Sequence, residues 1–422
     1  MKTKCPVIGI DVAKESSYYC ILDPEGRVYR ESFEAKNNLK SLKMVLQDIK
    51  KAEKEFGLKP VIILESTGHY SNPLVHFFAK KDFTILLINP LQSYSIKNSQ
   101  IRKLKTDKVD AKELAELYFL KDLRPFGKFD LPIEDLKILT RAFVKLSEQR
   151  TSFVNQLSAT VEQVMPRFNR VFADVGSKTS LEILECYASP DQMLKASKEE
   201  MINLIRTTSR KSEVYAAEKY DQLMSLCKES IEFGITLDSC YQLIKLYSKM
   251  VKEFSSELKK LKALMISLSQ EIMAIDLLKS IPGIGEGIAP VIMAEIGNIQ
   301  RFDNVKQLVA YCGLDPSVRQ SGNFIGSKNR ITKRGSKYIR RALYIAATVA
   351  IRKTSNGKFV NPVIHEYYQK KIQSKPRKQA LGAVMNKLVR IIYAVLKSNQ
   401  KFVLITPEEQ VKLYRSNLKV VA

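Results

Sequence analysis

Apolar residues in the first part of the chain recur with two different periods, one typical of β-strands and one of amphipathic helices. Short runs rich in β-branched and aromatic residues predict strands, and segments with apolar residues three and four positions apart predict helices. In chain order the predicted elements are strands Val7–Val12, Ser17–Asp23 and Arg27–Ala35, a helix Asn38–Phe56, a strand Val61–Leu64, a helix Pro73–Lys81, a strand Thr84–Ile88 and a helix from about Asp107 to Leu120. This order, βββαβαβα, is that of an RNase H-like α/β domain, which we expect over residues 1–128.

A long heptad pattern dominates the middle of the chain. Apolar residues recur there at alternating steps of three and four, and no Pro or Gly interrupts the run between Gly234 and Pro282, which predicts a coiled-coil helix. A weaker register predicts a second long helix, and we expect the two helices to pack on each other or on a second subunit. The helical region spans residues 129–276, with a mostly helical insertion of unassigned role at 166–234. The first register is Ile244, Tyr247, Val251, Phe254, Leu258, Leu261, Met265, Leu268, Ile272 and Ile275, and the second is Leu136, Leu139, Phe143, Leu146, Phe153 and Leu157.

The last third, residues 277–405, is predicted to be a mostly α domain followed by a tail at 406–422. Leu278–Gly297 has the pattern of a helix–hairpin–helix, in which the turn with Gly283 and Gly285 aims backbone N–H groups at a phosphate. An ordinary helix–loop–helix corner is the alternative. A Gly/Ser-rich loop at Ser317–Ser327 follows, and further helices are expected at Tyr338–Arg352 and Leu381–Lys397.

The balance of charge changes this picture from a globular protein to one that binds a polyanion. Lys and Arg number 69 against 44 Asp and Glu, a net charge of +25, which favours nucleic acid as the partner over the view that the protein is simply basic. Lys370–Lys378 holds five basic residues, and a denser run precedes it without a single acid. We expect both runs to contact phosphates, and the denser one consists of Lys328, Arg330, Lys333, Arg334, Lys337, Arg340 and Arg341.

Composition also indicates where the protein works. The six cysteines are scattered without a CxxC pair, which argues against a disulfide framework or a zinc ribbon and fits a reduced cytosol. The apolar run Pro6–Ile10 is cut short by Asp11, so no signal peptide is expected. The apolar stretch Ala342–Ile351 is too short to span a bilayer. We therefore expect a cytoplasmic protein with no membrane partner.

Four acidic residues are candidates for a metal site in the first domain. Asp11 and Glu65 end the first and fourth predicted strands, and Asp107 and Asp110 lie three residues apart on one face of the helix that begins there. Carboxylates are the ligands that Mg²⁺ prefers, with Mn²⁺ as an alternative, and two such ions about 4 Å apart can stabilise both oxygens of a phosphoryl displacement. Each acid alone could be a helix cap or a strand end, but the four together favour a metal site.

Several motifs give the chain a specific resemblance. In the N-terminal part and again in the C-terminal part, they resemble the DEDD-type insertion-sequence transposase family, whose better-known members are guided by a bridge RNA. The match covers both ends of the chain in the right order, and only the 166–234 insertion is longer than the family requires. The motifs are Gly9-Ile-Asp-Val-Ala-Lys14, Glu65-Ser-Thr-Gly-His-Tyr70, Asn89-Pro90, Lys105-Thr-Asp-Lys-Val-Asp-Ala111, Ile281-Pro-Gly-Ile-Gly285, Ala310-Tyr-Cys-Gly-Leu-Asp-Pro316, Gln320-Ser-Gly322, Arg330-Ile-Thr-Lys-Arg-Gly335 and Arg340-Arg-Ala-Leu343.

The resemblance implies a RuvC-like first domain whose four acids are Asp11, Glu65, Asp107 and Asp110. It also implies that Ser321, followed by a glycine, is the nucleophile that forms a covalent phosphoserine link with DNA. Spacing alone would make this serine a turn residue, and Ser317 and Ser327 are nearby alternatives. The chain has only three histidines, so a Ser–His pair has little support, and we expect metal held by the carboxylates to polarise the scissile phosphate in a composite site of two domains.

These observations leave four functions open. The first is a transposase that excises and inserts its element through phosphoserine intermediates, with a guide RNA and donor and target DNA as partners. The second is a protein-only DNA invertase of the same family. The third is a junction-resolving endonuclease that uses the four acids and water, and the fourth is a non-catalytic nucleic-acid-binding protein. Recombination joins four DNA ends, so we expect a dimer or tetramer held by the heptads, with a monomer as the alternative.

Overall fold

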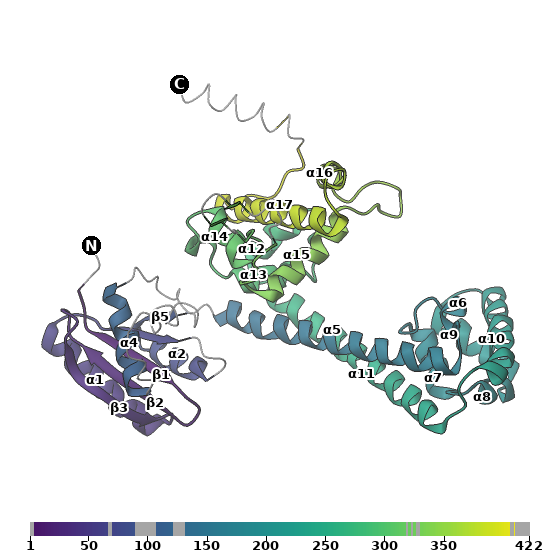
Figure 1. Ribbon diagram of the computed structural model, residues 1–422, viewed down its shortest axis with the longest axis horizontal. Helices are drawn as coiled ribbons and strands as arrows, with labels where there is room; N and C mark the ends of the chain where they lie inside the picture. Colours follow the sequence, from purple (N-terminus) through teal and green to yellow (C-terminus); the bar gives the residue numbers. More distant parts are fainter. Residues whose placement is uncertain are drawn as a thin grey trace. The chain divides into compact units, whose positions relative to one another are not determined.

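The structure is a computed structural model that describes residues 4–65, 70–88, 107–120, 131–317, 320–321, 324–325, 330–405 and 409. For Asp107, Leu131, Gln320, Ser321, Phe324 and Ile325 it describes the backbone only. The chain forms two compact units, Met1–Leu131 and Pro132–Ala422, and each is described by itself below (Figure 1).

The N-terminal unit is built on a mixed five-stranded sheet. Its strands lie in the order β3-β2-β1-β4-β5, where β1 pairs antiparallel with β2 and parallel with β4. β2 and β3 are antiparallel and β4 and β5 parallel, so three adjacent strands point the same way. The predicted strands are confirmed to within one residue at each end. They are β1 (Val7–Val12), β2 (Ser16–Leu22), β3 (Val28–Lys36), β4 (Val61–Glu65) and β5 (Thr84–Ile88).

Helices cover both faces of this sheet. On one face, α1 (Leu39–Phe56) and α2 (Ser71–Ala79) bury a core with the side chains of Ile8, Ile10 and Ile62. On the other face, α4 (Asp107–Leu120) buries Ala111 and Leu114 against Val7 and Ile63. This alternation follows from the period of two along a strand, which sends successive side chains to opposite faces. The α/β character expected for this region is therefore confirmed.

Helix α4 lies unusually close to strand β1. A Cβ atom added to Gly9 would lie 2.0 Å from the carbonyl oxygen of Ala111 and 2.8 Å from the amide nitrogen of Ala115. No side chain fits in that space, so glycine is required for close approach rather than for a special backbone angle. Ala111 and Ala115 are themselves small, which completes a contact of backbone on backbone.

Two long helices run through the second unit and pack side by side. Helix α5 (Leu131–Val164) and helix α11 (Asp238–Ser269) meet where the ring of Phe153 stacks on that of Phe254, with centroids 5.4 Å apart. The guanidinium of Arg150 donates a hydrogen bond to Ser255 Oγ at 2.7 Å. Of the two predicted arrangements, the structure of this single chain shows the two helices paired with each other.

One prediction about these helices is wrong. The heptad pattern predicts a continuous helix through Ile275, but α11 ends at Ser269, and α12 (Met273–Lys279) begins after a turn. Ile272 leaves the helix with φ −112° and ψ 92°. Its side chain packs on the hydrophobic cluster whose buried residues lie mostly between Ile275 and Leu396, which we call the C-terminal core. Burial of Ile272 and Ile275 in that core, rather than along the helix pair, outweighs the helical propensity of the sequence.

The insertion between the long helices is a compact helical lobe, as expected. We call residues 166–234 the distal lobe; its core includes Phe168, Leu184 and Leu223 and joins Val161 of α5 to Ile244 of α11. Four of its five helices begin at a serine whose side chain accepts a hydrogen bond from a backbone amide, the usual helix cap. The helices are α6 (Phe168–Val171), α7 (Lys178–Cys186), α8 (Pro190–Lys195), α9 (Lys198–Ser209) and α10 (Glu213–Phe233).

The remainder of the second unit packs around helix α17 (Arg377–Ser398). Among the described helices it is the one long and apolar enough to cross a membrane, but half of its apolar stretch is buried in the C-terminal core, where Leu388 and Ile392 lie. The N-terminal part of α5 and the C-terminal part of α11 enter the same core through Leu136 and Met265. The other elements are α13 (Ala289–Ile296), η1 (Ile299–Arg301), α14 (Val305–Tyr311), β6 (Gln320–Ser321), β7 (Phe324–Ile325), α15 (Lys337–Ala350) and α16 (Pro362–Ile372).

We predict that Gly9→Ala destabilises the N-terminal unit by about 1–3 kcal/mol, because its methyl group must push α4 off the sheet. Gly382→Ala is the matched control, since that helical position has open space and alanine favours helix by roughly 0.5–1 kcal/mol. Urea unfolding of both variants measures the difference. Equal stability of Gly9→Ala and the unchanged protein would contradict the close packing.

Candidate functional site

Two of the four candidate acids lie at the ends of adjacent parallel strands. The β1–β4 register pairs Ile10 with Leu64, so Asp11 and Glu65 occupy the next pair of positions along the strands. Because side chains alternate along a strand, both positions belong to the face of the sheet on which Val7 and Ile63 contact α4. Asp11 and Glu65 are each partly exposed there.

Helix α4 brings the other two acids to the same end of the sheet. The Sγ atom of Cys5 donates a hydrogen bond to the hydroxyl of Tyr118 at 3.3 Å, so the end of α4 lies near the start of β1. The helix then passes over Gly9, which leaves its first turn nearest the strand ends. Asp107 opens that turn, and Asp110 is 7% exposed. All four acidic positions thus belong to one edge of the N-terminal unit.

Their side chains do not make a complete metal site in the described part of the chain. Among the described side chains, no three Asp, Glu, His or Cys groups stand close enough to hold a metal ion. The side chain of Asp107 lies outside that set. Oxygen-only donors of this kind suit Mg²⁺ or Mn²⁺ rather than a soft metal.

The backbone of Ser321 lies in a small β-hairpin of the second unit. Strand β6 pairs with β7, where Ser321 is opposite Phe324. Two facing segments precede and follow this hairpin in sequence: Ser317 N–H donates to the carbonyl of Arg330 at 2.7 Å, and Thr332 N–H donates to that of Asp315 at 2.9 Å. We call these segments, 313–317 and 330–335, together with the hairpin, the serine arm. Ser327, Gly322 and Lys328 lie outside the described residues.

The described residues of the dense basic run lie on the outgoing side of this arm and at the start of α15. Arg330, Lys333, Arg334 and Lys337 are exposed, and Arg341 is half-buried. Arg340 differs, because its Nη1 donates to the backbone carbonyls of Cys312 and Gly335 at 3.2 and 3.4 Å and so braces the arm itself.

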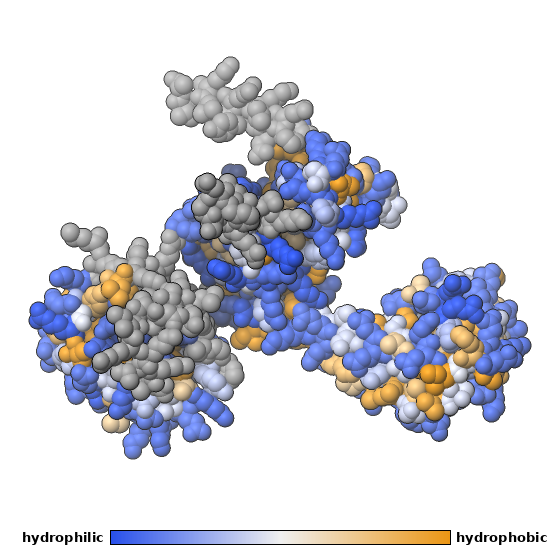
Figure 2. Space-filling view, viewed as in Figure 1, coloured by the Kyte–Doolittle hydropathy of each residue, from blue (hydrophilic) through white to orange (hydrophobic). Residues whose placement is uncertain are grey.

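Positive charge is concentrated in the region that carries the arm. Residues 277–405 hold 23 Lys and Arg against 5 Asp and Glu, whereas the distal lobe holds 10 against 11. The lobe also exposes apolar side chains, including Val214 and Phe233, and Figure 2 shows apolar patches over its surface. The net charge of the protein therefore points to the C-terminal region, not to the distal lobe, as the place that attracts a polyanion.

The two glycines of the predicted helix–hairpin–helix have different surroundings. A Cβ at Gly283 would lie 2.8 Å from Cβ of Ala350 and 3.0 Å from the carbonyl of Ala346, and φ there is +107°. Gly283 therefore lets the hairpin pack on α15. A Cβ at Gly285 would meet nothing within 4 Å, and this residue is exposed. Within the described residues, the N–H groups of Gly285 and Glu286 have no acceptor.

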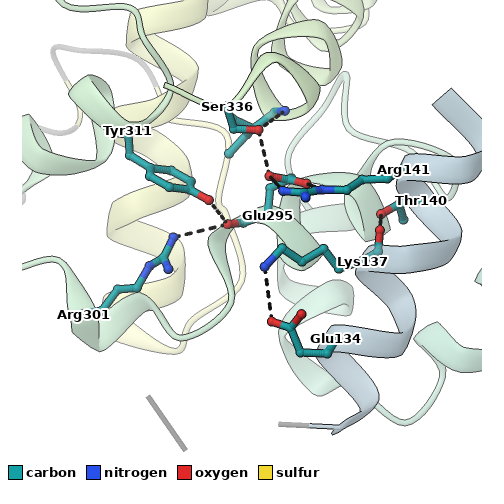
Figure 3. Close-up of polar contacts among 9 residues, drawn as sticks. Glu134, Lys137, Thr140, Arg141, Glu295, Arg301, Tyr311 and Ser336 are labelled. Atoms are coloured by element: carbon teal, nitrogen blue, oxygen red, sulfur yellow. Dashed lines mark hydrogen bonds and ion pairs between the residues drawn. The ribbon is translucent and has the colours of Figure 1, made fainter. Parts of the chain in front are cut away.

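Sequence reasoning missed Glu295, the most deeply buried carboxylate among the described residues of the second unit. Its side chain is fully buried, and its two oxygens accept hydrogen bonds from Arg141 Nε at 2.6 Å and Nη2 at 3.1 Å (Figure 3). Ser336 Oγ donates to the same carboxylate at 2.7 Å. The signal was present in the sequence, since Glu295 is the one charged residue of the otherwise apolar helix α13. The hydrogen bond to the Glu295 carboxylate raises the pKa of Arg141, so this guanidinium stays charged.

We predict that Gly283→Ala lowers the free energy of unfolding by roughly 1–3 kcal/mol, because its new methyl group would collide with Ala350 at a backbone angle that disfavours side chains. Gly285→Ala, its matched control in the same turn, should change stability by less than about 0.5 kcal/mol. Chemical denaturation measures both values. A stability loss of the same size in the two variants would refute the assignment of Gly283 to packing.

Two family models and one nearly full-length relative match this chain. Residues 8–166 match the IS110-type DEDD family described as transposase, and residues 275–369 match the family described as Transposase IS116/IS110/IS902 family. A protein named Insertion element IS110 uncharacterized 43.6 kDa protein, from Streptomyces coelicolor, is 21% identical over 92% of this chain and 93% of its own length.

Other relatives match a shorter region. The pilin gene-inverting protein of Moraxella bovis is 35% identical over 127 residues, which are 30% of this chain and 38% of that protein. The transposase for insertion sequence element IS1111A of Coxiella burnetii is 30% identical over 29% of this chain and 33% of its own length. The alignments to these two relatives thus span between about one third and two fifths of their lengths. Because these two family models match successive parts of the chain, and the Streptomyces coelicolor relative aligns over nearly the whole of both chains, the chain belongs to the IS110 family of DEDD transposases.

Proposed function

We propose that this protein is a DNA recombinase that cuts and rejoins strands to excise and insert a mobile element. The observation that carries the proposal is the gathering of four acidic positions at one edge of the N-terminal sheet, in a chain that belongs to a transposase family. The strand order β3-β2-β1-β4-β5, with its first three strands antiparallel, supports an RNase H-like assignment for this unit.

In this proposal Asp11, Glu65, Asp107 and Asp110 hold Mg²⁺ or Mn²⁺, whose charge would polarise the scissile phosphate. The donor set fits, since all four ligands are carboxylates. Burial of Asp110 under the first turn of α4 would hold its carboxylate in one orientation, while the partial exposure of Asp11 and Glu65 leaves them accessible to substrate.

Ser321 is the proposed nucleophile. As the bond between Ser321 Oγ and phosphorus forms, the bond from phosphorus to a sugar oxygen breaks; the serine hydroxyl loses a proton and the departing oxygen gains one. The phosphoserine link conserves the energy of the broken bond, so a second sugar hydroxyl can reverse the step and join new strands. The exposed Arg330, Lys333 and Arg334 of the same arm would hold the flanking phosphates.

The partners in this proposal are donor and target DNA and a guide RNA. The basic residues of 277–405 supply affinity for phosphates but little base specificity, which fits a protein that leaves sequence choice to RNA pairing. Assembly of two or four copies would supply one active centre for each strand that is exchanged.

A protein-only DNA invertase is the second candidate, because the Moraxella bovis relative is named as a pilin gene-inverting protein. The two functions share the acids and the serine. They differ in the need for RNA and in the DNA beside the gene, where an invertase would have an invertible segment.

We predict that Ser321→Ala abolishes the covalent protein–DNA link and lowers strand exchange by at least about 10³-fold, since the nucleophile is lost. Ser317→Ala is the matched control: this serine of the same arm contacts the amide of Arg330 and should leave the link intact. Denaturing gels of protein with labelled DNA measure the link. A junction-resolving endonuclease would instead lose cutting with Asp11→Asn and keep it with Ser321→Ala.

We predict that a discrete RNA co-purifies with the protein when it is expressed beside its native flanking DNA. Sequencing should find segments that match both the element junction and a target, because guidance requires pairing with each. Random cellular RNA in place of a discrete species would count against guidance and favour the invertase.

A further inference from the structure

Two adjoining segments connect the hairpin of the serine arm to the remainder of residues 277–405. We call 313–317 the incoming leg and 330–335 the outgoing leg. Tyr311, at the end of α14, precedes the incoming leg, and Ser336, the N-cap of α15, follows the outgoing one. Ser336 N–H donates to the carbonyl of Tyr311 at 2.9 Å, and Lys333 N–H donates to that of Gly313 at 3.2 Å. A Cβ at Gly335 would lie 1.8 Å from the Tyr311 carbonyl oxygen, so the legs touch backbone to backbone.

Glu295 is hydrogen-bonded to Tyr311 and Ser336, the residues that flank the two legs. The hydroxyl of Tyr311 donates to its backbone carbonyl at 2.8 Å, and Ser336 Oγ donates to its carboxylate at 2.7 Å. Arg301 donates to the same carbonyl at 3.3 Å, and its guanidinium lies over the Tyr311 ring at 4.5 Å. One residue of α13 therefore fixes the base of the arm on its incoming and its outgoing side (Figure 3).

Arg141 connects this anchor to the long helix α5. Its guanidinium holds both carboxylate oxygens of Glu295 and lies 4.9 Å from the centre of the Tyr338 ring, which belongs to the first turn of α15. A buried carboxylate is stable only with a charged partner or several hydrogen bonds, and here Arg141 and Ser336 supply both. Loss of the charge on Glu295 would weaken the hold of α5 on the arm while leaving the apolar core of α13 in place.

We infer that Glu295 and Arg141 are positioning residues that set the place of the serine arm relative to α5. Neither residue needs to touch DNA: they act through Ser336 and Tyr311 on the backbone that carries Ser321 and the basic run. The consequence for strand exchange rests on the proposed function, whereas the mechanical role of the pair does not.

Hydrogen–deuterium exchange of the full-length protein tests the mechanical role without substrate. Glu295→Gln keeps the shape of the side chain but removes its charge, and Tyr311→Phe removes a single hydroxyl from the anchor. We expect amide exchange in 313–317 and 330–341 to rise at least about tenfold in Glu295→Gln and several-fold in Tyr311→Phe. Arg141→Lys, which preserves the charge, should restore most of the protection lost in Arg141→Met.

Glu182→Gln is the matched control, because Glu182 of the distal lobe forms a 2.8 Å ion pair with Lys252 of α11, away from the serine arm in sequence. It should leave exchange in the serine arm unchanged. Unchanged exchange of the arm in both Glu295→Gln and Tyr311→Phe would overturn the inference. An equal rise over the whole second unit would also overturn it, since that outcome means a loss of general stability only.

Formation of the covalent link in a single turnover then tests the consequence. At saturating DNA, Glu295→Gln should form the link at least about tenfold more slowly, while its DNA affinity stays within about threefold because every basic side chain remains. A normal rate with a loosened arm would overturn the consequence for Ser321. If the unchanged protein forms no link while the arm still loosens in Glu295→Gln, the proposed function fails and the positioning role stands.

Discussion

The buried carboxylate of Glu295 needs a charged or hydrogen-bonding partner, and the C-terminal half of the second unit depends on this constraint. The side chain of Glu295 is wholly excluded from water, whereas that of Arg141 is 41% exposed. The two partners are therefore unequal: Arg141 without Glu295 could still be hydrated, but Glu295 without Arg141 would be a buried charge, and breaking such a pair costs on the order of 3–5 kcal/mol. Arg141 and Ser336 meet this demand and so join α5, α13 and the start of α15 at one point. Tyr311 adds the end of α14 through the backbone carbonyl of Glu295, and the serine arm extends from that point.

The N-terminal unit meets a different constraint, the close approach of α4 to β1 over Gly9. Strand register places Asp11 beside Glu65, but only the seating of α4 brings Asp107 and Asp110 to the same edge. The small residues at this contact therefore determine indirectly where Asp107 and Asp110 lie relative to Asp11 and Glu65. A helix held farther away by one methyl group would move its first turn, and the acids on it, away from the strand ends.

Charge and apolar surface are divided between the regions of the second unit. The excess of Lys and Arg lies in residues 277–405, while the distal lobe is nearly neutral and has a core of its own. Because α5 and α11 each enter both cores, the two long helices fix the lobe and the C-terminal core to one another within this unit. The positive charge that favours nucleic-acid binding can therefore lie in residues 277–405 without adding like-charge repulsion to the distal lobe.

The sequence by itself determined the elements whose signals are local. Strand period, helix period and turn residues predicted the five strands to within one residue and the long helices α5 and α11, because side-chain alternation and heptad spacing are written along the chain. Motifs with fixed spacing likewise revealed the family. The tertiary structure decided what depends on distant partners: the end of α11 at Ser269, where burial in the C-terminal core overrides helix propensity, and the packing role of Gly283 against α15. It also revealed Glu295, whose partner Arg141 lies 154 residues away along the chain, a separation that no periodicity can bridge.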